Sequence, residues 1–118
     1  MSPISKSLAL AVLATLVLGA VALAGSSATA VSVTAGKPSE FRFTLSKKMV
    51  PKGSVTFKVV NRGTVAHNFR IAGKKTRLVA KGKSATLTVS FPKAGKYAFL
   101  CTVRGHAAAG MKGVLTVR

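Results

Sequence analysis

Apolar and polar residues alternate with a period of two along most of the chain after residue 30. This is the period of a β-strand that has one buried face, and no helical period is evident in this part of the sequence. Runs rich in Gly, Pro and Asn separate the alternating segments and predict turns. The pattern predicts strands at residues 31–34, 40–45, 54–60, 66–71, 84–91, 96–100 and 113–117.

Short strands at this spacing predict an all-β fold, a Greek-key β-sandwich of about seven or eight strands. The alternation also predicts which side chains point into the core. Odd-numbered positions are expected inside, namely Phe41, Phe43, Leu45, Val55, Phe57, Val59, Leu87, Val89 and Phe91.

Two of the predicted strands direct reactive side chains toward the core. In the strand at 66–71 the inward positions include His67, whereas Asn68 is expected to face away. Cys101 follows the strand at 96–100 and continues its inward face. If the two strand ends lie at the same pole of the sandwich, an imidazole and a thiol converge there.

The first thirty residues differ from the rest and predict export. Residues 8–24 form an uninterrupted apolar and small-residue run, preceded by the single cation Lys6 and followed by Ala-Thr-Ala at 28–30. This pattern predicts a signal peptide at residues 1–30 and a folded domain at 31–118. An uncleaved membrane anchor is the alternative, because the run is near the lower length limit for a membrane span. We expect a periplasmic or other extracytoplasmic protein.

The composition is strongly basic, with 19 Lys or Arg residues, one acidic residue and a net charge of +18. Binding to nucleic acid is disfavoured, because the aromatic residues fall mainly on inward strand positions and leave no stacking platform. A single cysteine excludes an intramolecular disulfide, a Cys-rich zinc module, a Cys-x-x-Cys redox motif and c-type haem attachment.

The segment after Cys101 adds two further donors, His106 and Met111, each preceded by a glycine that lets the loop turn back. With His67 they provide two imidazoles, a thiolate and a thioether, which is the donor set of a blue copper site. Zinc sites seldom include Met, and hard cations prefer several carboxylates, whereas this chain has a single acidic residue. Taken singly, His67, Cys101 and Met111 could each be ordinary core residues.

The sequence resembles the cupredoxin family of small blue copper proteins. The resemblance rests on Ala-His-Asn-Phe at 66–69, on Gly-Lys-Tyr-Ala-Phe-Leu-Cys-Thr-Val-Arg-Gly-His at 95–106 and on Met111. The Cys-x4-His-x4-Met spacing is closer to auracyanin and rusticyanin than to plastocyanin or azurin. Arg104 departs from the family, which often has Pro in this part of the loop.

The resemblance implies one type 1 copper, with His67, Cys101 and His106 as equatorial ligands and Met111 as a weak axial ligand. It also implies that Asn68 ties its strand to the cysteine loop. We expect a single-electron carrier and not an enzyme. The alternatives are a copper carrier without redox turnover and, less favoured, a basic module that binds anions or nucleic acid.

The charge then predicts an acidic redox partner, such as a cytochrome or a membrane oxidoreductase, or an anionic membrane surface. We expect a monomer that exchanges electrons through the exposed edge of His106. The three alanines at 107–109 could form a flat contact patch beside it.

Overall fold

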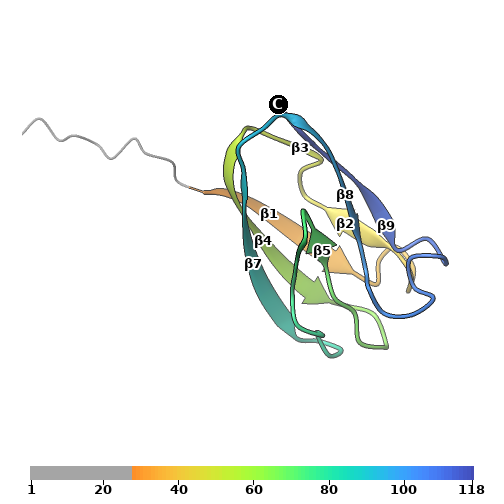
Figure 1. Cartoon of the computed structure of the whole chain (residues 1–118). Helices are drawn as coiled ribbons and strands as arrows, with labels where there is room; N and C mark the ends of the chain where they lie inside the picture. The colour runs from red at the N-terminus through yellow and green to blue at the C-terminus, as the bar shows by residue number, and fades with distance from the viewer. Residues whose placement is uncertain (1–27) are drawn as a thin grey trace, which may run out of the picture.

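The computed structural model describes residues 28–118, which form two β-sheets packed face to face (Figure 1). The described residues contain nine strands and no helix, which confirms the predicted all-β sandwich. The strands are β1 (Thr29–Ala35), β2 (Phe43–Leu45), β3 (Met49–Val50), β4 (Gly53–Asn61), β5 (Arg70–Ile71), β6 (Lys74–Lys75), β7 (Ser84–Phe91), β8 (Gly95–Leu100) and β9 (Lys112–Val117). Strands β3 and β6 were not predicted, because two residues are too few to reveal an alternation.

The first sheet has the order β2-β1-β4-β7, and the second has the order β3-β9-β8-β5-β6. Neighbouring strands are antiparallel except for the pairs β1–β4 and β3–β9, which are parallel. Within residues 28–118 there is no helix long and apolar enough to cross a membrane.

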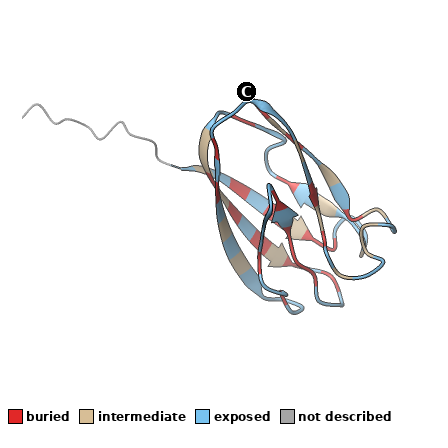
Figure 2. Cartoon of the chain, in the orientation of Figure 1, coloured by how far each residue is buried: buried red, intermediate tan, exposed pale blue. Residues whose placement is uncertain are grey.

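The core lies between the two sheets and follows the predicted parity. More buried and less buried residues alternate along β4 and β7, as Figure 2 shows by colour. The inward positions Val55, Phe57 and Val59 of β4 are fully buried, and Val89 and Phe91 of β7 pack with them. Burial of these side chains contributes roughly 1.5–3 kcal/mol each to folding.

The parity prediction is wrong at one end of the strand expected at 40–45. Strand β2 begins only at Phe43, and Phe41 lies outside the sheet with 37% of its surface exposed. The chain turns before β2, where the Gly36 N–H donates to the Arg42 carbonyl, and the Glu40 carboxylate reaches across to the N–H groups of another loop.

The strand expected at 66–71 is also shorter, because β5 contains only Arg70 and Ile71. His67 keeps a single antiparallel bridge, to Val79. Asn68 was expected to face away, but it is 4% exposed and its side chain bonds to the loop after β8. Without a neighbouring strand along its full length, this segment does not keep the strict period of two.

The predicted leader falls mostly in residues 1–27, which lie outside the described residues. Of its last three residues, Thr29 and Ala30 belong to β1 and pair with Val55 and Thr56 of β4. The boundary between the leader and the folded domain stays a prediction.

Candidate metal centre

Strand pairing brings His67 and Cys101 to the same end of the sandwich. Strands β5 and β8 are antiparallel, with Arg70 opposite Leu100, so the chain entering β5 lies beside the chain leaving β8. The Cys101 Sγ atom is 4.0 Å from the His67 Nδ1 atom, and both residues are buried. The predicted convergence of a thiol and an imidazole is confirmed.

The cysteine loop, residues 101–111, folds back so that its two ends meet. The Cys101 N–H donates to the Met111 carbonyl, and the Met111 N–H donates to the His106 carbonyl. Gly105 supports the reversal with a φ of +84°, a conformation that other residues rarely adopt. The loop thereby places the His106 Nδ1 atom 3.5 Å from the Cys101 Sγ atom.

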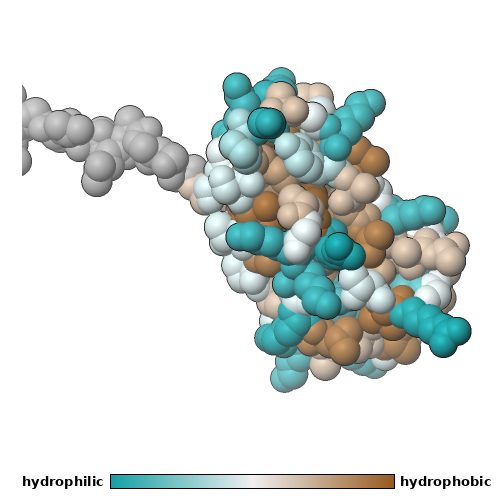
Figure 3. Space-filling model, viewed as in Figure 1, coloured by the Kyte–Doolittle hydropathy of each residue, from teal (hydrophilic) through white to brown (hydrophobic). Residues whose placement is uncertain are grey.

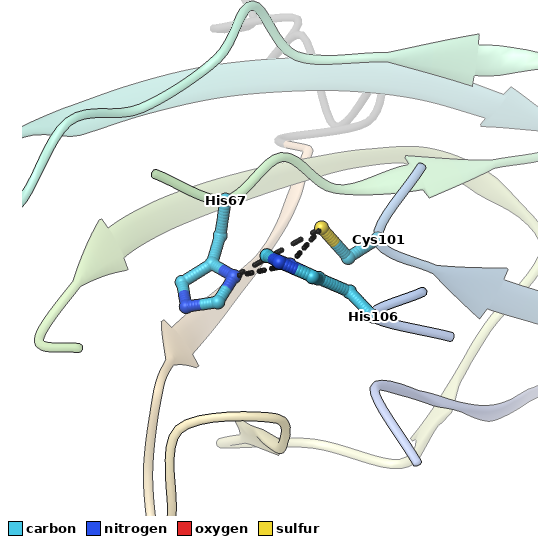
Figure 4. A group of neighbouring side chains, drawn as sticks. All are labelled: His67, Cys101 and His106. Carbon is cyan, nitrogen blue, oxygen red and sulfur yellow. Dashed lines mark hydrogen bonds between the residues drawn. The ribbon is translucent and has the colours of Figure 1, made fainter. Parts of the chain in front are cut away.

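Three donor atoms now face one point (Figure 4). The His67 and His106 Nδ1 atoms are 3.1 Å apart, and together with the Cys101 Sγ atom they form a triangle with sides of 3.1, 3.5 and 4.0 Å. The centre of that triangle is about 2 Å from each corner, close to the usual length of a metal–nitrogen bond. These distances fit a metal ion held by all three residues.

Met111 completes the predicted set at the end of the cysteine loop. It is fully buried in the same core cluster as Cys101, and its backbone is bonded to both Cys101 and His106. Two imidazoles, one thiolate and one thioether favour copper over zinc or a hard cation.

Glu40 bonds to the far side of the His67 ring and was not anticipated from the sequence. The His67 Nε2 atom is 2.8 Å from the Glu40 Oε1 atom. A carboxylate can only accept here, so Nε2 is the nitrogen that donates to Glu40, and Nδ1 is the nitrogen that faces the other two donors. The N–H groups of Thr64 and Val65 also donate to this carboxylate. Chiefly because of the Thr64 bond, the pKa of Glu40 is lowered from 4.5 to about 2.

His106 occupies a different environment from His67. Its side chain is partly exposed, and the Phe41 ring packs against it with ring centroids 4.9 Å apart. Burial, followed by the nearby His67, lowers the pKa of His106 below its usual 6.5. A lowered pKa favours the neutral ring, which is the form that binds a metal.

Asn68 connects the two segments that carry the donors. Its side-chain amide donates to the Thr102 hydroxyl at 2.6 Å, and its side-chain carbonyl accepts from the Thr102 N–H at 2.7 Å. The Asn68 N–H points to the Cys101 Sγ atom at 3.5 Å. A thiolate accepting this bond would be stabilised in its charged form.

A family model described as a cupredoxin-like domain matches residues 7–117. The chain belongs to the cupredoxin-like family. The resemblance inferred from the sequence is therefore confirmed, and the cupredoxin fold accounts for the His-Cys-His-Met arrangement as a type 1 copper donor set.

Two curated relatives match over short stretches. The copper-resistant cuproprotein CopI of Pseudomonas aeruginosa is 54% identical over 41 residues, which are 35% of this chain and 23% of CopI. Auracyanin-B of Chloroflexus aurantiacus is 45% identical over 42 residues, which are 36% of this chain and 18% of auracyanin-B. The aligned part of the chain spans less than a quarter of the length of either relative.

Solved cupredoxin structures match over most of the described fold. Reduced auracyanin of Roseiflexus castenholzii superposes with a TM-score of 0.66 and 26% identity, covering 80% of this chain and 99% of auracyanin. Rusticyanin of Thiobacillus ferrooxidans has a TM-score of 0.66 and 24% identity, with 79% of each chain covered. At that identity the rusticyanin match supports the fold alone.

Proposed function

We propose that this cupredoxin is a type 1 copper protein that transfers single electrons. The observation that carries the proposal is the convergence of two imidazole nitrogens and a thiol within 4.8 Å of one another at one end of a rigid β-sandwich. His67, Cys101 and His106 would hold the metal, with Met111 as a weak fourth ligand. Bound copper would supply the redox couple by cycling between Cu(I) and Cu(II).

The protein would orient the donors and exclude water. His67 and Met111 have no exposed surface, and Cys101 has 1%. Side chains fixed in this way move little when the charge of a bound metal changes, so gain or loss of an electron requires little rearrangement. We propose an electron carrier and not a catalyst.

His106 is the proposed electron port, because it is the one partly exposed member of the three-donor cluster. Phe41 packs on its ring, and Ala108 and Ala109 of the cysteine loop are exposed nearby in the chain. This arrangement supports the expected small apolar contact surface and adds Phe41 to it.

The proposed partner is an acidic redox protein, with an anionic membrane surface as the second possibility. Within residues 28–118, Glu40 is the only acidic side chain, and it is bonded to His67. The cations therefore lack carboxylate side chains to neutralise them, and hydrophilic side chains are spread over the face seen in Figure 3. Electrostatic steering by this charge predicts that the rate of association with the partner falls as the salt concentration rises. We further propose an exported monomer.

The first test is addition of Cu(II) to the purified protein. Intense visible absorption from thiolate-to-copper charge transfer is expected, together with a type 1 electron paramagnetic resonance spectrum. Cys101→Ser should abolish the colour, whereas Met111→Leu should keep it and shift the reduction potential. A colourless protein that binds zinc stoichiometrically would contradict the proposal.

Copper carriage without redox turnover is a second candidate, favoured by the similarity to the cuproprotein CopI. The two functions separate in one experiment with the copper-loaded protein. An electron carrier is reduced and reoxidised by donor and acceptor proteins while its copper stays bound. A copper carrier instead loses its metal to a competing chelator or acceptor in one oxidation state.

A further inference from the structure

The single acidic residue of this basic chain is bonded to a proposed metal ligand. Glu40 is the one Asp or Glu among 118 residues that include 19 Lys or Arg. In the described part of the structure its only ion-pair contact is with His67, at 2.8 Å, and it pairs with no Lys or Arg side chain. Neutralisation of a surface Lys or Arg therefore does not explain why an acidic residue occurs at position 40.

A dedicated turn fixes the Glu40 carboxylate. The Thr64 N–H lies 3.0 and 2.9 Å from its two oxygens, the Thr64 hydroxyl donates at 3.1 Å and the Val65 N–H donates at 3.1 Å. Gly63 leaves the necessary room, because a Cβ atom at that position would lie 2.5 Å from Oε1. The carboxylate is thus held by groups that lie outside the donor cluster.

The His67 ring lies between this carboxylate and the donor triangle. Its Nε2–H donates to Glu40, and its Nδ1 faces His106 and Cys101. A hydrogen bond from the far nitrogen to a carboxylate makes an imidazole a stronger donor and fixes its tautomer and orientation. A stronger donor, with a negative charge behind it, stabilises Cu(II) more than Cu(I).

We propose that Glu40 is a positioning residue that fixes the Nδ1-donor tautomer of His67 and lowers the reduction potential of the copper centre. This inference rests on the proposed type 1 copper function. A purely structural role, in which Glu40 only ties the turn at Thr64 to the chain before β2, is the alternative.

Glu40→Gln separates the two roles, because the amide oxygen can still accept from His67 while the charge is removed. We expect the variant to turn blue with Cu(II) and to have a higher reduction potential. The equilibrium should shift toward Cu(I) by about tenfold, equivalent to about 59 mV for one electron. Thr86→Lys changes the net charge by the same amount at an exposed position of β7, distant in sequence from Glu40. This control variant should leave the reduction potential nearly unchanged.

The outcomes distinguish this inference from the proposed function. If the wild type is not blue, the copper proposal fails. If wild type and Glu40→Gln are both blue with equal potentials, or if Thr86→Lys shifts the potential as much, only the Glu40 inference is overturned.

A second measurement needs neither copper nor a substitution. Nitrogen chemical shifts of the His67 ring in the metal-free wild type should report a protonated Nε2 and an unprotonated Nδ1. A ring protonated at Nδ1 alone would overturn the inference, even if Glu40→Gln fails to fold.

Discussion

Two segments supply the donors, and they are held in different ways. The upstream segment, residues 61–69, depends largely on two side chains, Asn61 at its start and Glu40 from another part of the fold. Asn61, at the end of β4, bonds to Gly63, Val65 and Val79, and the Glu40 carboxylate holds the turn that follows. Backbone pairing holds the two ends of the segment, at Asn61 and Phe69, and between them His67 has its bridge to Val79.

The cysteine loop is held mainly by its own backbone. His106 donates to Val103, Ala109 donates to Gly105, and the two ends are joined between Cys101 and Met111. His67 is therefore fixed by long-range contacts, whereas His106 lies on a turn that is stabilised by local backbone bonds and can face a partner. Substitutions in the upstream segment should therefore cost more stability than those in the loop.

The largest expected effect comes from Asn61→Ala. The buried amide makes two donor bonds and accepts one, so its loss removes three bonds. The Gly63 N–H and the Val65 carbonyl lose this partner, whereas the Val79 carbonyl keeps its bond from the His67 N–H. The free energy of unfolding should fall by about 3 kcal/mol, measured by denaturant titration of the metal-free protein. Thr86→Ala, on the exposed face of β7, should change it by less than about 0.5 kcal/mol. If both variants lose the same free energy of unfolding, the side chain of Asn61 does not hold the upstream segment.

Asn68→Ala tests the link between the two segments and should cost about 2 kcal/mol. Both side-chain bonds to Thr102 are lost, and the cysteine loop should shift, which would broaden the copper spectrum. Thr102→Val removes only the hydroxyl contact and should cost about half as much. The double variant should be no less stable than Asn68→Ala, because the two residues share these bonds. Fully additive losses would show that Asn68 acts elsewhere.

Alternation in the sequence was sufficient to predict the strands that are paired along their length, such as β4 and β7, and the inward direction of His67 and Cys101. It failed where the chain leaves the sheet. Asn68 turns inward because its amide finds Thr102 in the loop after β8, and a period of two cannot anticipate such a partner. Glu40 was missed because His67 lies 27 positions away in the sequence. The one indication of its role in the sequence was that Glu40 is the single acidic residue of the chain.

Gly105→Ala tests the cysteine loop itself and should cost about 1 kcal/mol. The φ of +84° disfavours a side chain, while the space around a Cβ atom is open, so the cost is conformational alone. Gly82→Ala is the matched control, with a φ of +75° and equally open space in the turn before β7. Both variants should lose similar stability, and only Gly105→Ala should weaken copper binding, measured by competition with a chelator. Equal copper affinities would mean that the loop tolerates a changed turn.

Ala108→Asp should have the smallest effect on the fold, because the residue is exposed in the cysteine loop. The change places a negative charge beside the proposed port at His106, where an acidic partner would approach. Association with that partner should slow by about tenfold at low salt, measured by stopped-flow electron transfer, with the visible spectrum unchanged. Thr88→Asp makes the same charge change on the outer face of β7, where it pairs with Thr56, and should slow the reaction much less. If both variants slow the reaction equally, net charge and not the surface around His106 governs the encounter. If neither does, the partner docks elsewhere, and the partial exposure of His106 has another explanation.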